Sequence, residues 1–229
     1  MSGSGTMTHA DLCLLDRDGP IATVTLNRPA AKNALNIDLL NALIGRLEEC
    51  VAAGVTVLVL RAEGTAFCAG ADLRSDDGTS IGKPTLRRDL IENAISLVSS
   101  FPVAISVVHG PAVGGGWGLA FAADVVLAAE DALFKFPELA LGFLPPEPIV
   151  RRFHEVAGPV RSLRLLGSGE SFRAGDRALA GLVEAMAPDL LGERAQGLAD
   201  LFARSAPGLL RVLKQSAGSV HVQERHAHE

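Results

Sequence analysis

The sequence predicts a single α/β domain that ends in a helical C-terminal part. Short apolar runs of strand length alternate with amphipathic segments of helix length through the first half of the chain. After Pro148 the apolar residues follow a helical spacing. The 229 residues contain no linker long enough to separate two domains, and a chain of this length buries a substantial core.

The first strand and helix are expected close to the N-terminus. Residues Ile21–Leu26 (IATVTL) alternate β-branched and small side chains, which predicts a strand. Asn36 can cap a helix over Ile37–Ala53, whose apolar residues share one face. Gly54 ends this helix, and the nearly all-apolar run Val55–Leu60 predicts a strand buried on both faces.

The same alternation continues in the middle of the chain. A helix is expected over Thr85–Ser100, and the apolar run Val103–Val108 predicts a second buried strand. This strand leads into the densest glycine cluster, His109–Gly118 (HGPAVGGGWG). The remaining expected elements are a helix at Leu119–Ala123, a strand at Asp124–Ala128, and helices at Val160–Leu166 and Leu190–Arg204.

Composition excludes several classes of protein. The net charge of −5 leaves no basic surface for nucleic acid. No apolar run reaches the roughly 18 residues of a membrane span. The three cysteines are an odd number without CxxC spacing, which argues against a disulfide framework or a zinc site. We therefore expect a cytoplasmic protein with no metal, no membrane contact and no nucleic-acid partner.

Two loops of small residues follow the buried strands: Ala69-Gly70-Ala71-Asp72 and Gly114-Gly115-Gly116. Small residues let a ligand approach peptide N–H groups closely. Two such groups that converge on one point form an oxyanion hole, which stabilises a developing enolate or tetrahedral oxyanion. Rossmann, P-loop and hydrolase-elbow motifs have other spacings and are excluded.

Four motifs in order make the sequence similar to one family. They are LNRPAAKNALN (Leu26–Asn36), LRAEGTAFCAGADL (Leu60–Leu73), VHGPAVGGG (Val108–Gly116) and FKFPELALG (Phe134–Gly142). Together they resemble the crotonase, or enoyl-CoA hydratase/isomerase, family. The resemblance implies a spiral of ββα units over residues 7–186, followed by a shortened helical segment and tail at 187–229.

The resemblance also implies ligands and partners. The substrate would be an acyl thioester of coenzyme A or of a phosphopantetheine arm, with no separate cofactor. The chain would form a homo-trimer or hexamer, and an acyl carrier protein is a possible partner. By motif position, the oxyanion-hole amides belong to Ala71 and Gly115. The other expected substrate-binding residues are Ala69, Gly70, Asp72, Leu73, Gly114, Trp117 and Gly118.

The acid–base residues depart from the hydratase pattern. Hydratases of the family carry one Glu just after the glycine loop and a second in the F-x-x-P-E segment. Here the second is Glu138, whereas the first position holds Gly118. With one carboxylate, efficient hydration is not expected. Glu138 could instead remove a C2 proton from a 3-enoyl thioester and return it at C4, which is isomerisation.

Other interpretations remain open at this stage. Decarboxylation, or other enolate chemistry on a malonyl-type thioester, would use the same oxyanion hole. A non-catalytic protein that binds acyl thioesters is the third possibility. Glu147, within the run Pro145–Pro148, and His109, before the glycine loop, are reserve candidates for proton transfer.

Overall fold

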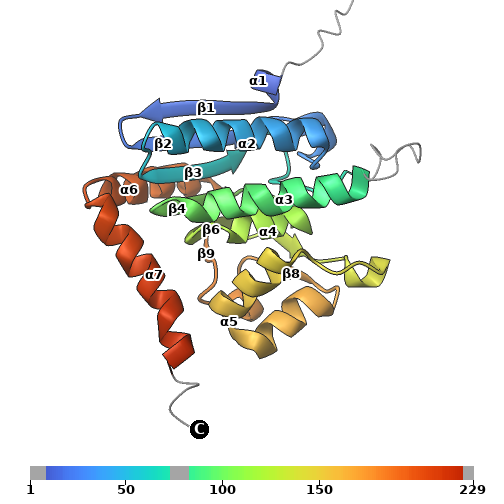
Figure 1. The fold of residues 1–229 in the computed structure, drawn as a ribbon. Coiled ribbons are helices and arrows are strands. Elements are labelled where there is room, and N and C mark those ends of the chain that lie inside the picture. Colours follow the sequence, from blue (N-terminus) through green and yellow to red (C-terminus); the bar gives the residue numbers. More distant parts are fainter. Residues whose placement is uncertain (1–8, 73–82, 224–229) are drawn as a thin grey trace, which may run out of the picture.

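The fold is known from a computed structural model that describes residues 9–72 and 83–223 (Figure 1). Its main sheet has the strand order β1-β2-β3-β4-β6-β9. Strand β1 runs antiparallel to β2, and the remaining neighbours are parallel. The strands are β1 Cys13–Asp18, β2 Ile21–Leu26, β3 Val57–Ala62, β4 Val103–Val108, β6 Val125–Ala129 and β9 Glu184–Met186.

Helices cover this sheet. In Figure 1, α2 and α3 lie in front of it, and α6 contacts its strands from β2 to β6. The last helix, α7, runs away from the sheet toward the C-terminus. The helices are α1 His9–Leu12, α2 Ile37–Ala52, α3 Lys83–Ser100, α4 Gly115–Phe121, α5 Glu147–Gly167, α6 Leu191–Ala203 and α7 Pro207–Gln223.

A second, small sheet positions the glycine cluster. It has the order β5-β7-β8, with β5 parallel to β7 and β7 antiparallel to β8. Its strands are β5 Ala112–Val113, β7 Leu133–Lys135 and β8 Ser171–Arg173. Because β5 immediately precedes α4 and β7 precedes Glu138, this sheet brings the glycine loop and the carboxylate together.

The predicted α/β class is confirmed, and several elements match closely. The strands at Ile21–Leu26 and Val103–Val108 have the predicted bounds. The backbone N–H of Leu39 donates to Oδ1 of Asn36 at 2.9 Å, so Asn36 caps α2 as expected. Helix α6 agrees with the prediction to within one residue at each end.

Three expectations need correction. The strand expected at Val55–Leu60 runs over Val57–Ala62. Helix α4 begins at Gly115, inside the glycine cluster, rather than at Leu119. Helix α5 begins at Glu147, because the proline run initiates a helix there; prolines are well tolerated in a first turn. Its second half matches the prediction and follows a break at Gly158, whose φ is +74°.

Within residues 9–72 and 83–223, no helix is long and apolar enough to cross a membrane.

Candidate functional site

The two glycine loops lie side by side. Cys68 pairs with Ala112: the Cys68 N–H donates to the Pro111 carbonyl at 3.1 Å, and the Val113 N–H donates to the Cys68 carbonyl at 2.9 Å. Gly70 has a φ of +84°, and a Cβ on it would lie 2.7 Å from the Val113 carbonyl oxygen and 3.7 Å from the Gly115 nitrogen. Glycine is therefore required at position 70 for the loops to touch.

The amides of Ala71 and Gly115 are available on this junction. Leu35 bridges to Ala71 by donating to the Gly70 carbonyl at 2.7 Å and accepting from the Asp72 N–H at 3.1 Å. In such a parallel bridge the N–H of the central residue, Ala71, points away from Leu35. Gly115 is the first residue of α4, where an N–H has no partner within the helix. Both N–H groups can therefore donate to a ligand.

Glu138 lies against this junction. The Gly114 N–H donates to the Lys135 carbonyl at 2.8 Å, which holds the loop on β7, three residues before Glu138. A Cβ on Gly114 would collide with Oε1 of Glu138 and would lie 3.1 Å from its Cδ. The carboxyl group therefore rests directly on the bare backbone of Gly114, one residue from the Gly115 amide.

Burial sets the protonation of Glu138. Its Oε2 is buried and has no hydrogen-bond partner within the part of the chain that the structure describes. Burial raises the pKa of the Glu138 carboxyl from 4.5 to about 7, opposed by a hydrogen bond from its own backbone N–H. A carboxyl that titrates near neutral pH can both accept and return a proton during a reaction.

The wall beside these groups is apolar. A Cβ on Gly115 would lie 3.4 Å from Cδ1 of Leu35 and 3.5 Å from Cδ1 of Ile91. A Cβ on Gly118 would collide with Ile149 and would lie 3.5 Å from Cδ1 of Ile95. All four aliphatic side chains are buried. The arrangement thus combines two peptide donors, one carboxyl group and a hydrocarbon wall.

Comparison with known proteins identifies the family. The family model described as enoyl-CoA hydratase/isomerase matches residues 16–226. The chain belongs to the crotonase family. The 2,3-dehydroadipyl-CoA hydratase of Escherichia coli is 35% identical over 205 residues, which cover 89% of this chain and 80% of that protein. A probable enoyl-CoA hydratase of Bacillus subtilis is 34% identical over 198 residues, which cover 84% of this chain and 76% of that protein.

Solved structures agree with this assignment. A putative enoyl-CoA hydratase/isomerase family protein from Hyphomonas neptunium has a TM-score of 0.84 at 26% identity, covering 94% of this chain and 85% of that one. An enoyl-CoA hydratase from Bacillus anthracis has a TM-score of 0.83 at 28% identity, and the match covers 90% of this chain and 82% of that one. The family resemblance and the crotonase fold expected from the motifs are confirmed.

Asp72 holds this crotonase's first glycine loop in place. Its Oδ2 accepts from Nη1 of Arg28 at 2.7 Å, and its carbonyl accepts from Nη1 of Arg87 at 3.2 Å. The same Arg28 nitrogen donates to the Ala34 carbonyl at 3.0 Å. The carboxylate is thus engaged by a guanidinium group and acts on the loop that carries Ala71. Leu73, expected to bind substrate, lies outside the described residues.

Trp117, expected from its place beside the glycine loop to bind substrate, is a core residue of this structure. It follows Gly115 by two residues, about 200° around a helix, so it points away from the Gly115 side of α4. Its side chain is fully buried, with ring centroids of five phenylalanines within 6.1 Å. These partners are Phe121, Phe134, Phe136, Phe153 and Phe172. Trp117 therefore supports α4 from the core.

The reserve candidates lie in other surroundings. The side chain of Glu147 is 70% exposed and pairs with Nη2 of Arg151 at 3.4 Å. Nε2 of His109 is 2.9 Å from the Gly64 carbonyl, and because a carbonyl only accepts, this nitrogen carries the proton. Neither group shares the burial and missing partner that distinguish Glu138. The Cys68 thiol donates to the Asn33 carbonyl at 3.1 Å, and burial raises its pKa to about 12.

Sequence reasoning missed Asn33, which shapes the first loop. It is fully buried with a φ of +53°. Its Nδ2 donates to the carbonyls of Glu63 and Ala66 at 2.8 and 2.9 Å, and its Oδ1 accepts from the Arg28 N–H at 2.8 Å. The signal available was its place within the LNRPAAKNALN motif.

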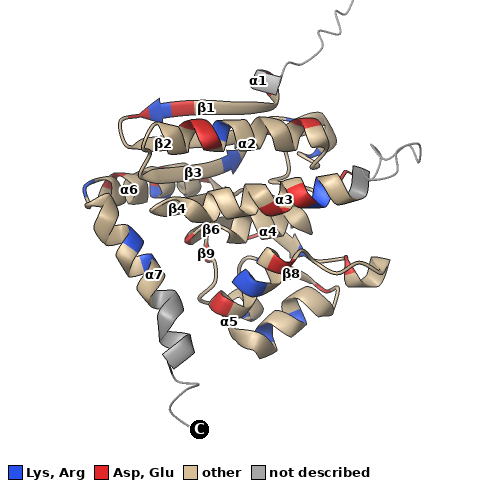
Figure 2. Cartoon of the chain, in the orientation of Figure 1, with Lys and Arg blue, Asp and Glu red and all other residues tan. Residues whose placement is uncertain are grey.

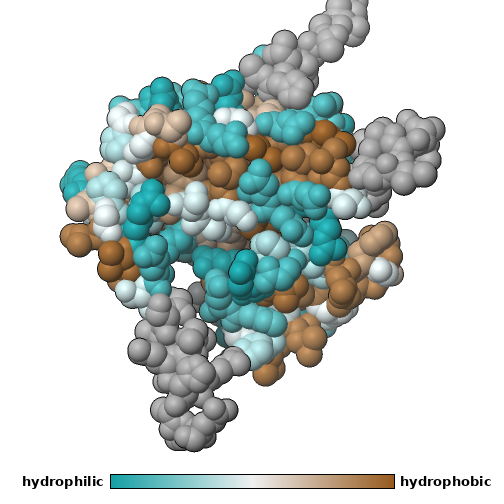
Figure 3. Space-filling model, in the orientation of Figure 1, coloured by the Kyte–Doolittle hydropathy of each residue, from teal (hydrophilic) through white to brown (hydrophobic). Residues whose placement is uncertain are grey.

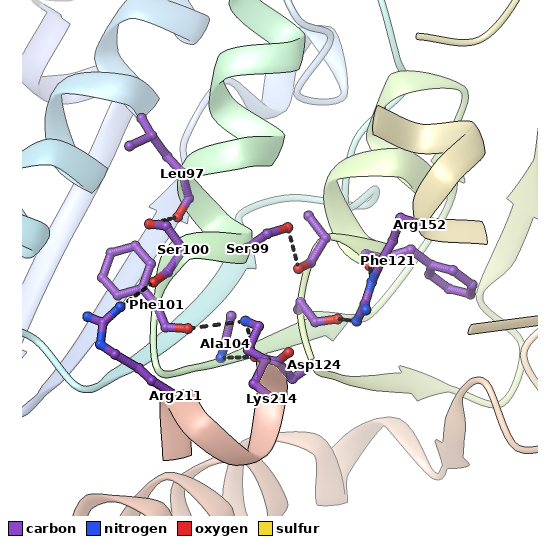
Figure 4. Close-up of polar contacts among 12 residues, drawn as sticks. Leu97, Ser99, Ser100, Phe101, Ala104, Phe121, Asp124, Arg152, Arg211 and Lys214 are labelled. Atoms are coloured by element: carbon purple, nitrogen blue, oxygen red, sulfur yellow. Dashed lines mark hydrogen bonds and ion pairs between the residues drawn. The ribbon is translucent and has the colours of Figure 1, made fainter. Parts of the chain in front are cut away.

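A cavity of about 510 Å³ lies elsewhere, where α7 meets the end of α3 and α5. Three cations line it: Arg152, Arg211 and Lys214 (Figure 4). Each donates to backbone carbonyls, namely those of Ser100, Phe101, Phe121 and Ala123. Nζ of Lys214 also contacts Asp124 at 2.8 Å. These cations attach α5 and α7 to the rest of the fold.

Removing the glycine at position 114 should disable the site. In Gly114→Ala the new Cβ collides with the Glu138 carboxyl, and its φ of +53° strains an L-residue. We expect kcat/KM on an enoyl thioester to fall about 100-fold or more, and stability to fall by about 1–3 kcal/mol. The control is Gly181→Ala, where φ is +76° but nothing lies within 4 Å of the new Cβ. Equal activity in the two variants would contradict the placement of Glu138.

Proposed function

We propose that this crotonase is an enoyl-CoA isomerase that moves a double bond from C3–C4 to C2–C3 of an acyl thioester. One observation carries the proposal: Oε2 of Glu138 is buried with no hydrogen-bond partner among the described residues, and the carboxyl group lies against Gly114 beside the Gly115 amide. The thioester is carried by coenzyme A, as in the names of the relatives, or by a phosphopantetheine arm.

The proposed reaction uses one base twice. The Glu138 carboxylate removes a proton from C2, which is acidified by the thioester. The electron pair moves into the carbonyl, and the resulting dienolate oxygen accepts from the N–H groups of Ala71 and Gly115. The protonated Glu138 then donates to C4, so that the double bond lies between C2 and C3. Each oxyanion donor is worth about 3–4 kcal/mol of barrier.

The surroundings support chemistry with a single carboxyl group. Helix α4 carries no charged residue, and its whole ribbon is tan in Figure 2. The aliphatic side chains beside Gly115 and Gly118 offer no hydrogen bonds to a water molecule. Hydration requires a water that is held and activated, whereas proton transfer from C2 to C4 requires only the one base.

The test is incubation with a 3-enoyl-CoA in D₂O. Isomerisation should produce the ultraviolet absorbance of a conjugated thioester and introduce deuterium at C2 or C4. If neither signal appears at substrate concentrations that bind, the proposal is overturned. Release of CO₂ from a malonyl-type thioester would favour decarboxylation, and binding without any turnover would favour a non-catalytic role.

Hydration is the second candidate, because the relatives at 34% and 35% identity are named as hydratases. It is measured in the same preparation with a 2-enoyl-CoA, by the loss of conjugated absorbance. We expect it to be slower than isomerisation by at least tenfold, since one carboxyl group must activate the water and also supply the C2 proton. Hydration that is as fast as isomerisation would make hydration the primary activity.

Rate should depend on pH through Glu138. The first step needs the carboxylate, and the pKa of this carboxyl is about 7. We expect kcat/KM for isomerisation to rise about tenfold per pH unit below pH 7 and to level off above it. A profile already flat from pH 5 upward would mean that the base has an ordinary carboxyl pKa and is another group.

We also propose that the chain forms a homo-trimer or hexamer. Besides the brown band over α2, exposed apolar side chains gather at the lower right and at the left edge of Figure 3. The first follows Glu138 and includes Leu139, Leu141, Phe143, Leu144, Val160 and Leu163. The second lies on α6 and α7 and includes Leu201, Leu209, Val212 and Leu213. Light scattering at the protein concentration of the assay tests this, and a monomer would contradict it.

A further inference from the structure

Ile149 occupies the volume in front of Gly118. A Cβ built on Gly118 would collide with Cδ1 of Ile149 and would lie 2.7 Å from its Cγ1. Ile149 is 1% exposed, and Ile95, which closes the other side of this volume, is 3% exposed. The absence of a side chain at position 118 therefore leaves no empty space, because a side chain from α5 fills it.

The position of Ile149 is fixed by its neighbours. It lies in the first turn of α5, where its N–H donates to the Pro146 carbonyl at 3.0 Å, and Pro148 precedes it. One turn later, Arg152 donates to the carbonyls of Phe121 and Ala123, both at 2.9 Å, at the C-terminal end of α4 (Figure 4). An isoleucine in a helix also has one strongly preferred rotamer. Helix α5 is thus held against α4 at a set separation.

The same volume adjoins the proposed base. The Gly118 N–H donates to the Gly114 carbonyl at 3.0 Å, so the two glycines lie one turn apart on one side of α4. The Glu138 carboxyl lies against the backbone of Gly114. A side chain at position 118 would therefore lie one helical turn along α4 from that carboxyl, in the space that Ile149 now fills.

We propose that Ile149 determines the reaction specificity of this site by filling the place of a second carboxylate and of the water that it would hold. The proposal rests on the proposed isomerase function. A bound water needs two to four polar partners, and Ile149 supplies none. With this volume closed, Glu138 acts on the substrate alone, and proton transfer is favoured over addition of water.

The first test is thermal stability in four proteins: wild type, Gly118→Glu, Ile149→Ala and the double variant. We expect each single substitution to lower Tm, the first by collision and the second by a cavity. The double variant should be more stable than the sum of the two losses predicts, by about 2–4 °C or more, because the new Glu enters the space that truncation of Ile149 leaves empty. Additive losses would overturn the packing part of the proposal.

The matched control installs Glu at another helical glycine. Gly45 is exposed in α2, and nothing lies within 4 Å of a Cβ built there. Gly45→Glu with and without Ile149→Ala should show additive changes in Tm. Coupling of the same size in this control would mean that Ile149→Ala loosens the whole fold, and would overturn the specific pairing with position 118.

The second test is hydration of a 2-enoyl-CoA, in which the water oxygen adds to C3 and a proton adds to C2. We expect the Gly118→Glu/Ile149→Ala variant to hydrate at least tenfold faster than wild type and than either single variant. A folded, coupled double variant without this gain overturns the specificity role of Ile149, as does a wild type that already hydrates equally fast. The isomerase proposal fails separately, if the wild type gives no deuterium exchange or conjugated product from a 3-enoyl-CoA.

Discussion

The Glu138→Gln variant should lose isomerisation while keeping its fold. Gln has nearly the same shape but cannot take a proton from C2, so kcat should fall by about 10²–10⁴-fold with little change in the Kd of a thioester ligand. Steady-state kinetics and ligand titration check these two quantities. Full activity in Glu138→Gln, together with loss of activity in Glu147→Gln, would show that the base is the exposed carboxyl at the start of α5.

The same substitution should make the protein more stable at high pH. The folded-state pKa of Glu138 is about 7, against 4.5 as the ordinary value, so the folded protein holds a proton that the unfolded chain releases. Stability is therefore lost as pH rises from about 4.5 through 7. Gln removes this loss. At pH 8 the gain should be about 2 kcal/mol after allowance for the partial exposure of Glu138, and at pH 4 it should vanish.

Denaturant unfolding of wild type and Glu138→Gln at pH 4, 6 and 8 measures this gain. A variant that is less stable than wild type at pH 8 would mean that the carboxylate has a stabilising partner. A gain that is independent of pH would mean that the effect does not come from ionisation. In either case the burial of an unpaired carboxylate would not describe the site.

Truncation of Trp117 should have the largest effect on stability. Trp117→Ala opens a cavity among five phenylalanine rings, at a cost of about 3–5 kcal/mol. For a chain of this size that corresponds to a fall in Tm of about 10 °C, measured by calorimetry.

Trp117→Phe is the matched comparison. It keeps an aromatic ring, and it removes the indole Nε1, which is buried with no hydrogen-bond partner among the described residues. Loss of that unsatisfied donor offsets part of the lost packing. We expect Trp117→Phe to lose less than half of the stability lost by Trp117→Ala. Equal losses would mean that the indole has a role beyond filling space.

Local sequence patterns were sufficient to predict the main strands and to locate the glycine loops. Val103–Val108 is recognisable because a continuous apolar run of strand length, bounded by turn residues, is typical of a strand buried on both faces. Asn36 is recognisable as a cap because its side chain acts on the next turn. Glu138 and the two loops were found by motif, and the structure brings them together at Gly114 and Gly115.

Features that depend on long-range packing could not be found this way. Strands β5, β7 and β9 have two or three residues each, too few for a periodic signal, and exist because of their partners. The packing of Trp117 among phenylalanines depends on where α4 starts, since the start sets which side each residue faces, and the helix begins earlier than expected. Ile149 carries no local signal, because its role arises only where α5 packs on α4.

The backbone contacts between the glycine loops have a consequence for how such a site can diversify. The proposed donors, Ala71 and Gly115, follow adjacent parallel strands and are fixed by main-chain hydrogen bonds. Two of the side chains that line the site come from helices: Ile91, beside Gly115, is on α3, and Ile149, beside Gly118, is on α5. The proposed oxyanion donors and these two side chains are therefore carried by separate parts of the fold. Substitutions on the two helices can therefore change the apolar wall while the backbone that carries the proposed donors stays the same.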